Sequence, residues 1–232
     1  MEFETAVLDR LVSVLRKADW SAVVGVLEEL VGPVSSVLLY GSRARGQEHA
    51  ESDYDLLVVA AAAGEGIRFV YGGLDLDIEV CSAAVYEEAL EGRLYLDCGR
   101  VLLDRGGFLG EWLARLRARR AQGPVALSEA QRLRMAGWLD RMLRRARAGG
   151  TVGALRGAAL ASSLPEAAVD CLGSWPGSPL QNLEVLRARW PELHGLLERW
   201  AEEGGLEHLE SAVRLVAGAY TAGPKGSARD DL

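Results

Sequence analysis

Hydrophobic positions follow two different periods along the chain, and the change of period divides it into regions. Apolar residues recur every three or four positions over 3–18 and 23–31, which predicts two amphipathic helices. From Val34 to Asp104 the apolar runs are short, as in β-strands. Beyond residue 107 the helical period returns and continues to about residue 220. We therefore predict an α/β (α+β) N-terminal domain with a small mixed sheet, followed by an all-α helical bundle domain.

The predicted domain boundary lies where the last apolar strand gives way to Gly106-Gly107. This places the first domain at 1–106 and the helical domain at 107–221. Residues 222–232 are small and polar, and we expect them to be disordered.

Four apolar runs provide the strands that matter for function. Val34–Tyr40 stops at a Gly-Ser pair, and a second run ends at Leu57-Val58-Val59. Ile67–Tyr71 and Leu74–Val80 are joined by Gly72-Gly73, a typical two-residue hairpin turn. If this hairpin pairs beside the second run, its acidic residues would lie near those of that run.

Several polar residues mark the ends of the expected helices. Asp19, Ser128 and Ser178 each precede an apolar helical pattern, and the two serines are followed three residues later by glutamine, as in a capping box. Ser82 is expected to begin a helix that ends at Gly92.

The candidate chemistry lies between the first two strands. Asp53 and Asp55 would project from the same face, since alternate strand residues share a face. Adjacent carboxylates repel each other unless a cation lies between them. Gly41 and Ser42 offer backbone N–H groups to an anion at the end of the preceding strand. Either signal alone is typical of a solvated turn, but together they indicate a site for a metal-bound nucleoside triphosphate.

A third acidic ligand is expected from the later strand. Asp75, Asp77 and Glu79 fall on one of its faces, and any of them could complete a metal site. The alternative is an exposed acidic face that protects a sheet edge from aggregation.

Arginines and histidines near these acids have more open roles. Arg43 and Arg45 begin a helix behind the Gly-Ser turn, and one of them could contact the triphosphate, face solvent or pair with Glu48. His49 lies in a polar loop. His194 and His208 lie among acids on helices and are expected at the surface.

Taken together, these motifs resemble a known family. Gly41-Ser42-Arg43-Ala44-Arg45-Gly46 followed by Ser52-Asp53-Tyr54-Asp55-Leu56 resembles the DNA polymerase beta-like nucleotidyltransferase superfamily. The motif is similar to its small bacterial branch, which includes aminoglycoside and lincosamide nucleotidyltransferases and the minimal nucleotidyltransferases of toxin–antitoxin pairs. The resemblance covers roughly residues 34–104.

The resemblance implies transfer of a nucleoside monophosphate, with AMP from ATP favoured, to an acceptor hydroxyl. It implies that Asp53, Asp55 and Asp77 hold two Mg²⁺ ions, with Glu79 as the substitute for Asp77. A small-molecule acceptor is expected. The alternatives are AMPylation of a partner protein, RNA as acceptor, and a non-catalytic nucleotide-binding module. Two copies of the chain could share one site.

Composition narrows the remaining possibilities. The net charge of −7 argues against a dedicated duplex-DNA binder. Ten arginines lie within residues 111–148, but arginine is the general surface cation of this chain, so we expect a solvated helix face. The three cysteines fit neither a disulfide framework nor a zinc site. The sequence shows neither a signal peptide nor a membrane span, and the cytoplasm is the expected location.

Overall fold

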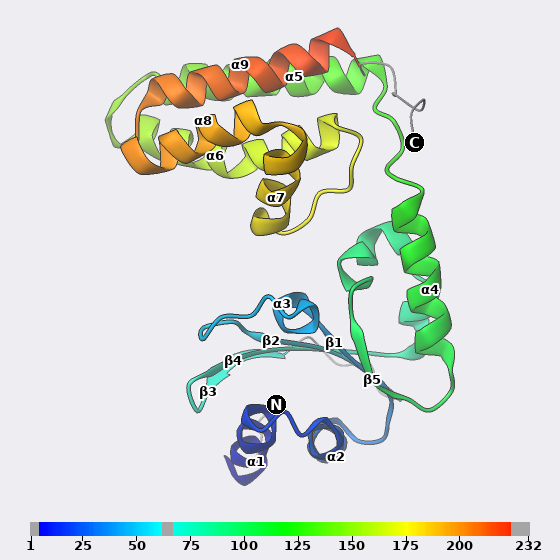
Figure 1. The fold of residues 1–232 in the computed structure, drawn as a ribbon. Helices are drawn as coiled ribbons and strands as arrows, with labels where there is room; N and C mark the ends of the chain where they lie inside the picture. The colour runs from blue at the N-terminus through cyan, green and yellow to red at the C-terminus, as the bar shows by residue number, and fades with distance from the viewer. Residues whose placement is uncertain (1–4, 62–66, 224–232) are drawn as a thin grey trace. The chain divides into compact units, whose positions relative to one another are not determined.

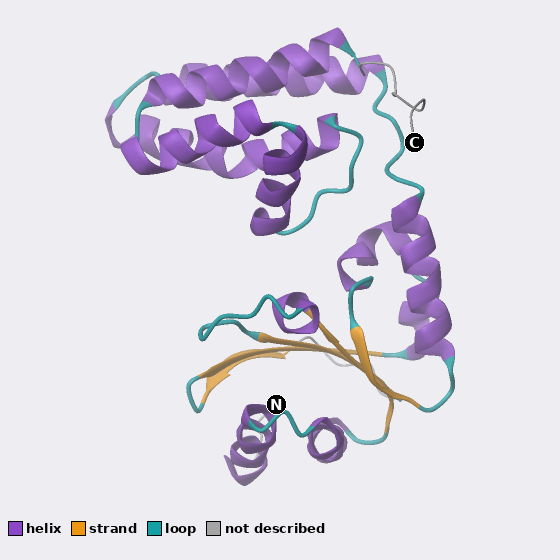
Figure 2. Cartoon of the chain, in the orientation of Figure 1, coloured by secondary structure: helices purple, strands orange, loops and turns teal. Residues whose placement is uncertain are grey.

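The computed structural model describes residues 5–61 and 67–223. Its internal contacts divide the chain into two compact units, residues 1–122 and 123–232. Figures 1 and 2 show that the described strands belong to the first unit, whereas the described elements of the second are helices. The predicted order of a mixed α/β region followed by a helical region is therefore confirmed.

A five-stranded sheet forms the centre of the described part of the first unit. Its order is β3-β4-β2-β1-β5. β1 is antiparallel to β2 and β5, β3 and β4 form the predicted hairpin, and β2 runs parallel to β4. The parallel pair brings the first residues of β2 beside those of β4. The strands are β1 (Val34–Tyr40), β2 (Tyr54–Ala60), β3 (Ile67–Tyr71), β4 (Leu74–Cys81) and β5 (Arg100–Asp104).

Two N-terminal helices cover one face of this sheet. Figure 1 shows α1 (Thr5–Arg16) and α2 (Trp20–Val31) on the same side of the strands. Their apolar stripes are buried against the inward-facing residues of β1, β2 and β4 in one continuous core. Asp19 caps α2 as predicted, because its side chain accepts a hydrogen bond from the Ala22 N–H.

The segment after β4 differs from the prediction. Ser82 is an N-cap, but two 3₁₀ helices follow it, η1 (Ala83–Glu87) and η2 (Leu90–Leu96), in place of one helix ending at Gly92. Leu94 and Leu96 are buried, and η2 packs against α4. Because these two leucines are buried, the helical conformation continues beyond Gly92 to Leu96.

The unit boundary also differs from the expected position. α4 (Phe108–Ala121) buries Leu109, Trp112 and Leu116 and packs against β5 and η2, so the first unit extends to residue 122 rather than 106. The chain does leave the sheet at residues 104–107, but the next helix packs its apolar face against η2 and β5 of the same unit. Of the tail expected at 222–232, Ala222 is the last residue of α9 and 224–232 lie outside the described residues.

The second unit is built from helices around its own core. Leu139, Leu160 and Val213 are among its fully buried side chains. Both predicted capping boxes are present, at Ser128 and at Ser178. The helices are α5 (Glu129–Ala146), α6 (Gly150–Cys171), α7 (Pro179–Arg189), α8 (Pro191–Glu203) and α9 (Leu206–Ala222). Among the described residues, none of the helices has the length and apolarity needed to cross a membrane.

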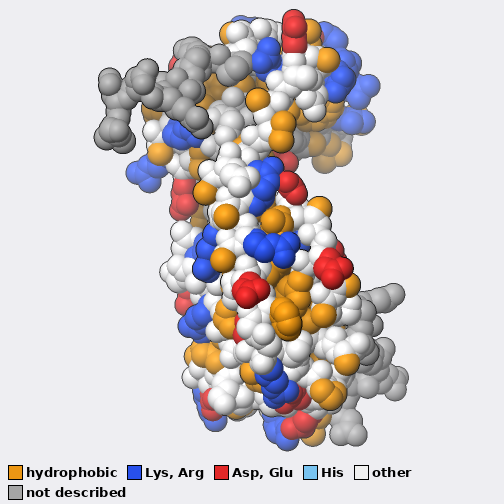
Figure 3. Space-filling model, turned by 90° about the vertical axis from the view of Figure 1, so that its right-hand side faces the viewer, with side chains coloured by type: hydrophobic (Ala, Val, Ile, Leu, Met, Phe, Trp, Pro, Cys, Tyr) orange, Lys and Arg blue, Asp and Glu red, His pale blue; other side chains and the backbone are white. Residues whose placement is uncertain are grey.

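The arginine-rich segment 111–148 is divided between the two units. In the first unit, Arg119 pairs with Glu91 and Arg120 with Asp97, and in the second Arg147 pairs with Glu210. Figure 3 shows basic and acidic side chains interspersed on the face that carries α4. The pairing favours a solvated, charge-compensated surface over a continuous basic patch.

Candidate active site

A sharp turn at the end of β1 creates one wall of the site. Gly41 has a φ of +70°, and it begins α3 (Gly41–Arg45), a single short turn of helix. A Cβ at this position would overlap with the carboxylate of Asp55. The glycine is therefore required twice, for its left-handed backbone and for the close approach of the acid.

Ser42 adds an unsatisfied polar group next to this turn. Its Oγ is buried and has no hydrogen-bond partner among the described residues. A buried hydroxyl without a partner is costly, of the order of 1–3 kcal/mol. The turn thus offers a hydroxyl that is available to a ligand oxygen.

Arg43 fixes the segment that enters β2. Its Nε donates to the Asp53 carbonyl at 2.9 Å and its Nη2 to the Ser52 carbonyl at 2.6 Å. The guanidinium also stacks on the Tyr54 ring, 3.8 Å from the centroid. These contacts hold the backbone of the acidic motif, so the structure gives Arg43 a positioning role.

Arg45 keeps more freedom. Its Nε donates to Gln47 Oε1 at 2.9 Å, and its Nη1 lies 3.6 Å from Cys98 Sγ. Its charge also acts on Asp55, whose pKa it lowers against larger opposing effects. Of the two arginines, Arg45 is the better candidate for contact with a phosphate.

The sheet register brings the candidate carboxylates together. Asp55 of β2 lies directly beside Asp77 of β4 in the parallel pair, and Asp53 immediately precedes β2. Residues paired in a parallel sheet project to the same face. Two of the three acids predicted from sequence are thus register partners, and the third lies two residues away.

The charges of the other two acids act on Asp55. Burial, followed by the charges of Asp53 and Asp77, raises the pKa of Asp55 to about 6 against the lowering effect of Arg68 and Arg45. Burial, followed by the charges of Asp77 and Asp55, also raises the pKa of Tyr40. The site therefore concentrates negative charge that its own residues only partly compensate.

The contacts of the three acids on β4 distinguish among them. Glu79 forms an ion pair with Arg93, and Tyr95 Oη donates to it at 3.4 Å. Asp75 is exposed and pairs across the hairpin with Val70. Of these three acids only Asp77 lies beside Asp55, which makes it the best candidate for a third metal ligand, whereas Glu79 is held in its ion pair with Arg93.

The donor set suits a hard divalent cation, because it consists of carboxylate oxygens. Within residues 5–61 and 67–223, however, no three His, Cys, Asp or Glu side chains form a ready-made metal cluster. Arg68 lies beside two of these acids. Its Nη2 lies 2.7 Å from Asp77 Oδ2 and 3.9 Å from Asp53 Oδ2, so a guanidinium contacts both acids.

The remaining candidates are engaged elsewhere. His49 Nδ1 accepts from the Glu51 N–H at 3.3 Å in the loop before β2. His194 pairs with Glu198 and His208 with Glu203. The cysteines Cys81, Cys98 and Cys171 are free thiols.

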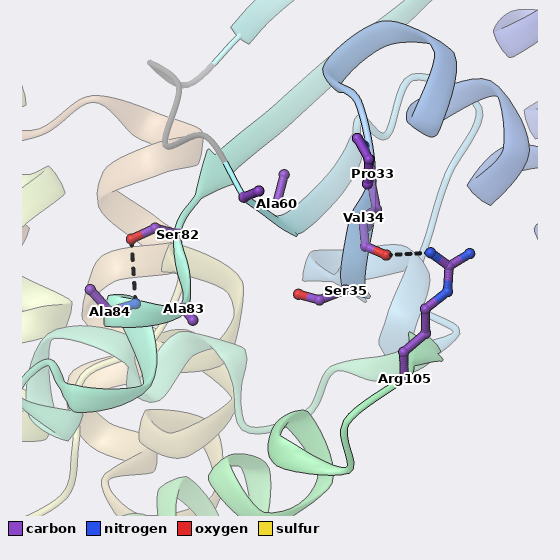
Figure 4. A pocket seen from close by; sticks show the side chains of 9 residues that line it. Pro33, Val34, Ser35, Ala60, Ser82, Ala83, Ala84 and Arg105 are labelled. Atoms are coloured by element: carbon purple, nitrogen blue, oxygen red, sulfur yellow. Dashed lines mark hydrogen bonds between the residues drawn. The ribbon is translucent and has the colours of Figure 1, made fainter.

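A pocket of about 580 Å³ lies at the opposite end of the sheet (Figure 4). It is lined by small and apolar residues at the start of β1 and the ends of β2 and β4, together with Arg105, whose Nη1 donates to the Val34 carbonyl at 2.9 Å. None of the candidate residues lines it. The candidate site is therefore the end of the sheet that carries the carboxylates, where charge and polar groups converge.

Comparison with known proteins gives a family match for part of the first unit. Residues 21–96 match the family model described as a nucleotidyltransferase domain. The matched residues lie within the first unit. Such a domain implies transfer of a nucleoside monophosphate from a nucleoside triphosphate, and the matched segment contains the acidic residues, the Gly-Ser turn and both arginines. The specific bacterial branch of the family rests on the motif resemblance alone.

No curated protein sequence matches the chain significantly. Among solved structures, the chain is similar to a nucleotidyltransferase-like protein from Exiguobacterium sibiricum, with 15% identity and a TM-score of 0.42. The match covers 88% of this chain and 74% of that one.

Sequence reasoning missed Arg68 and Arg93. The first could have been found from the hairpin itself. A two-residue turn at Gly72-Gly73 pairs Tyr71 with Leu74, and counting outward pairs Arg68 with Asp77. Arg93 gave no local signal, because it reaches Glu79 from a separate 3₁₀ helix.

We predict that Gly41→Ala destabilises the protein by about 1–3 kcal/mol and weakens nucleotide binding, because it combines left-handed strain with a clash against Asp55. Urea unfolding and nucleotide titration measure the two effects. Gly46→Ala is the matched control. Gly46 also has a positive φ, of +67°, but no atom lies within 4 Å of its added Cβ. Equal losses in the two variants would contradict the clash.

The raised pKa of Asp55 predicts a specific pH dependence. The folded carboxyl holds its proton to about pH 6, above the value of about 3.9 in an unfolded chain. The folded state therefore binds more protons between these values, and stability falls as pH rises through them. In metal-free buffer, Asp55→Asn should be more stable than wild type at pH 7–8, and the gain should vanish below about pH 4.

Thermal unfolding from pH 4 to 8 measures this difference. Glu48→Gln, which removes an exposed acid from the neighbouring loop, is the control. A gain for Asp55→Asn that is constant across the range would show that the carboxyl is not the source.

Proposed function

We propose that this protein is a Mg²⁺-dependent nucleotidyltransferase that moves a nucleoside monophosphate, with ATP the favoured donor, to the hydroxyl of a small molecule. One observation carries the proposal. Within the segment that matches the nucleotidyltransferase domain, the parallel register sets Asp55 beside Asp77, and Gly41 packs closely against the carboxylate of Asp55.

The residues divide the work of the reaction. Asp53, Asp55 and Asp77 would hold the metal ions, which when bound would neutralise triphosphate charge and make the acceptor hydroxyl more acidic. The Gly41 turn brings backbone N–H groups close to the phosphates without a Cβ in the way. Ser42 Oγ would gain the hydrogen bond it lacks, and Arg45 adds positive charge.

The chemical step conserves every atom. The acceptor oxygen forms a bond to the α-phosphorus, the bond from that phosphorus to the bridging oxygen breaks, and pyrophosphate leaves with that electron pair. The acceptor hydroxyl loses its proton to solvent water. Positioning and charge stabilisation supply most of the catalysis in such a reaction, and both are properties of the edge formed by β1, β2 and β4.

The acceptor is assigned from the motif resemblance to the antibiotic-modifying nucleotidyltransferases. Incubation with α-labelled NTP separates the acceptor classes, because label on a small molecule supports the proposal, whereas label on a protein indicates AMPylation. Label on RNA would support the alternative hypothesis that RNA is the acceptor. Triphosphate binding without any transfer would indicate a binding module.

We predict that Mg²⁺ with the correct NTP raises the midpoint temperature of thermal unfolding. A ligand at 100 times its dissociation constant adds about 2.7 kcal/mol of stability. We expect the shift for one or more of the four NTPs, only with Mg²⁺, and not in Asp53→Asn/Asp55→Asn. A shift of wild-type size in that double variant would refute this use of the acids.

A further prediction distinguishes the role of Asp77 from that of Glu79 on β4. Asp77→Asn should reduce nucleotide transfer roughly 100-fold or more, as the loss of a major electrostatic group does. Glu79→Gln should keep most activity but lower the thermal midpoint, because it leaves Arg93, whose side chain is 17% exposed, without one of its charge partners. The reverse pattern would move the metal site to Glu79.

A further inference from the structure

The side chain of Arg68 lies beside two of the candidate metal ligands, Asp77 and Asp53. It lies on β3, the edge strand of the sheet, and it is the antiparallel register partner of Asp77. Its Nη2 lies 2.7 Å from Asp77 Oδ2 and 3.9 Å from Asp53 Oδ2. Among the described residues, the candidate metal ligands Asp53, Asp55 and Asp77 form these two ion pairs and no others.

The other nearby arginines do not take this role. Arg43 donates to two backbone carbonyls and stacks on Tyr54, and Arg45 donates to Gln47. Among the described residues, Arg68 is thus the cation that forms ion pairs with the acidic cluster, while Arg45 acts on Asp55 through its charge without an ion pair.

The pair formed by Arg68 can be broken at small cost. The side chain of Arg68 is 68% exposed, and exposed ion pairs contribute roughly 0–1 kcal/mol. Because an edge strand has no neighbouring strand on its outer side, a guanidinium on it can rotate toward solvent without disturbing backbone hydrogen bonds there. A divalent cation has twice the charge and binds carboxylate oxygens directly.

We propose that Arg68 is the internal counter-ion of the metal-free site and that a divalent cation binds by displacing its guanidinium from Asp77 and Asp53. The inference rests on the proposed function. Arg68 is a positioning residue that holds the acids together before the metal arrives. It also competes with the metal, so it lowers the apparent affinity of the empty site.

Mn²⁺ binding without nucleotide tests the proposal, measured by the electron paramagnetic resonance signal of free Mn²⁺. Arg68→Gln should bind Mn²⁺ about two- to fivefold more tightly, which is the loss of a competing exposed pair. Arg68→Lys should remain close to wild type. Arg16→Gln is the control for the hairpin, because Arg16 contacts the carbonyl of Gly72 at its turn and none of the acids.

A second measurement observes the displacement directly. In ¹⁵N NMR spectra, the Arg68 Nε–H signal is assigned by its absence in Arg68→Gln. Titration with Mg²⁺ should shift this signal and speed its exchange with water as the guanidinium leaves Asp77. In an Asp77→Asn background, Arg68→Gln should change Mn²⁺ affinity by less than in wild type.

The outcomes separate this inference from the proposed function. Asp53→Asn first establishes whether wild-type Mn²⁺ binding depends on the acids. If it does and Arg68→Gln binds Mn²⁺ equally or more weakly, the counter-ion role is overturned while the metal site stands. If Arg68→Gln weakens only Mg²⁺–NTP binding, Arg68 is a phosphate ligand and the inference is wrong. If neither wild type nor Arg68→Gln binds Mn²⁺, both proposals fail.

Discussion

The repulsion between carboxylates at one end of the sheet is the constraint on which the site depends. The parallel pairing of β2 with β4 places Asp55 beside Asp77, with Asp53 two residues away. Folding must bring like charges together in a half-buried place, and burial alone already raises the pKa of Asp55. A fold that keeps such an arrangement gains little stability from it, so its value lies in what the charge attracts.

The surrounding residues fit this constraint in different ways. Gly41 removes its own Cβ from the space that the carboxylate of Asp55 needs. Arg43 fixes the backbone before β2, so the acids are held at a set position without being neutralised. Arg93 pairs with Glu79 and keeps a further negative charge out of the cluster. Together these contacts define which acids remain available to a cation.

Local signals in the sequence were enough to predict much of this arrangement. The Gly-Ser turn, the Asp-x-Asp motif and the Gly72-Gly73 hairpin each follow from short-range rules, and the structure contains all of them. The pairing of β2 with β4 is non-local, since two strands of similar pattern could adopt other registers. The ion pair between Arg93 and Glu79 and the packing of α4 against η2 and β5 also depend on tertiary packing, which no local pattern contains.

The position of Arg68 on an edge strand ties the electrostatics to the topology. A central strand would hold its side chains between two neighbours, and any displacement would disturb both ladders. β3 pairs only with β4, so the guanidinium of Arg68 can leave Asp77 toward solvent while the β2–β4 register stays intact. The metal ligands are thus set on the inner strands, whose geometry must not change. The cation that compensates them is set on the outer strand, whose side chains can move.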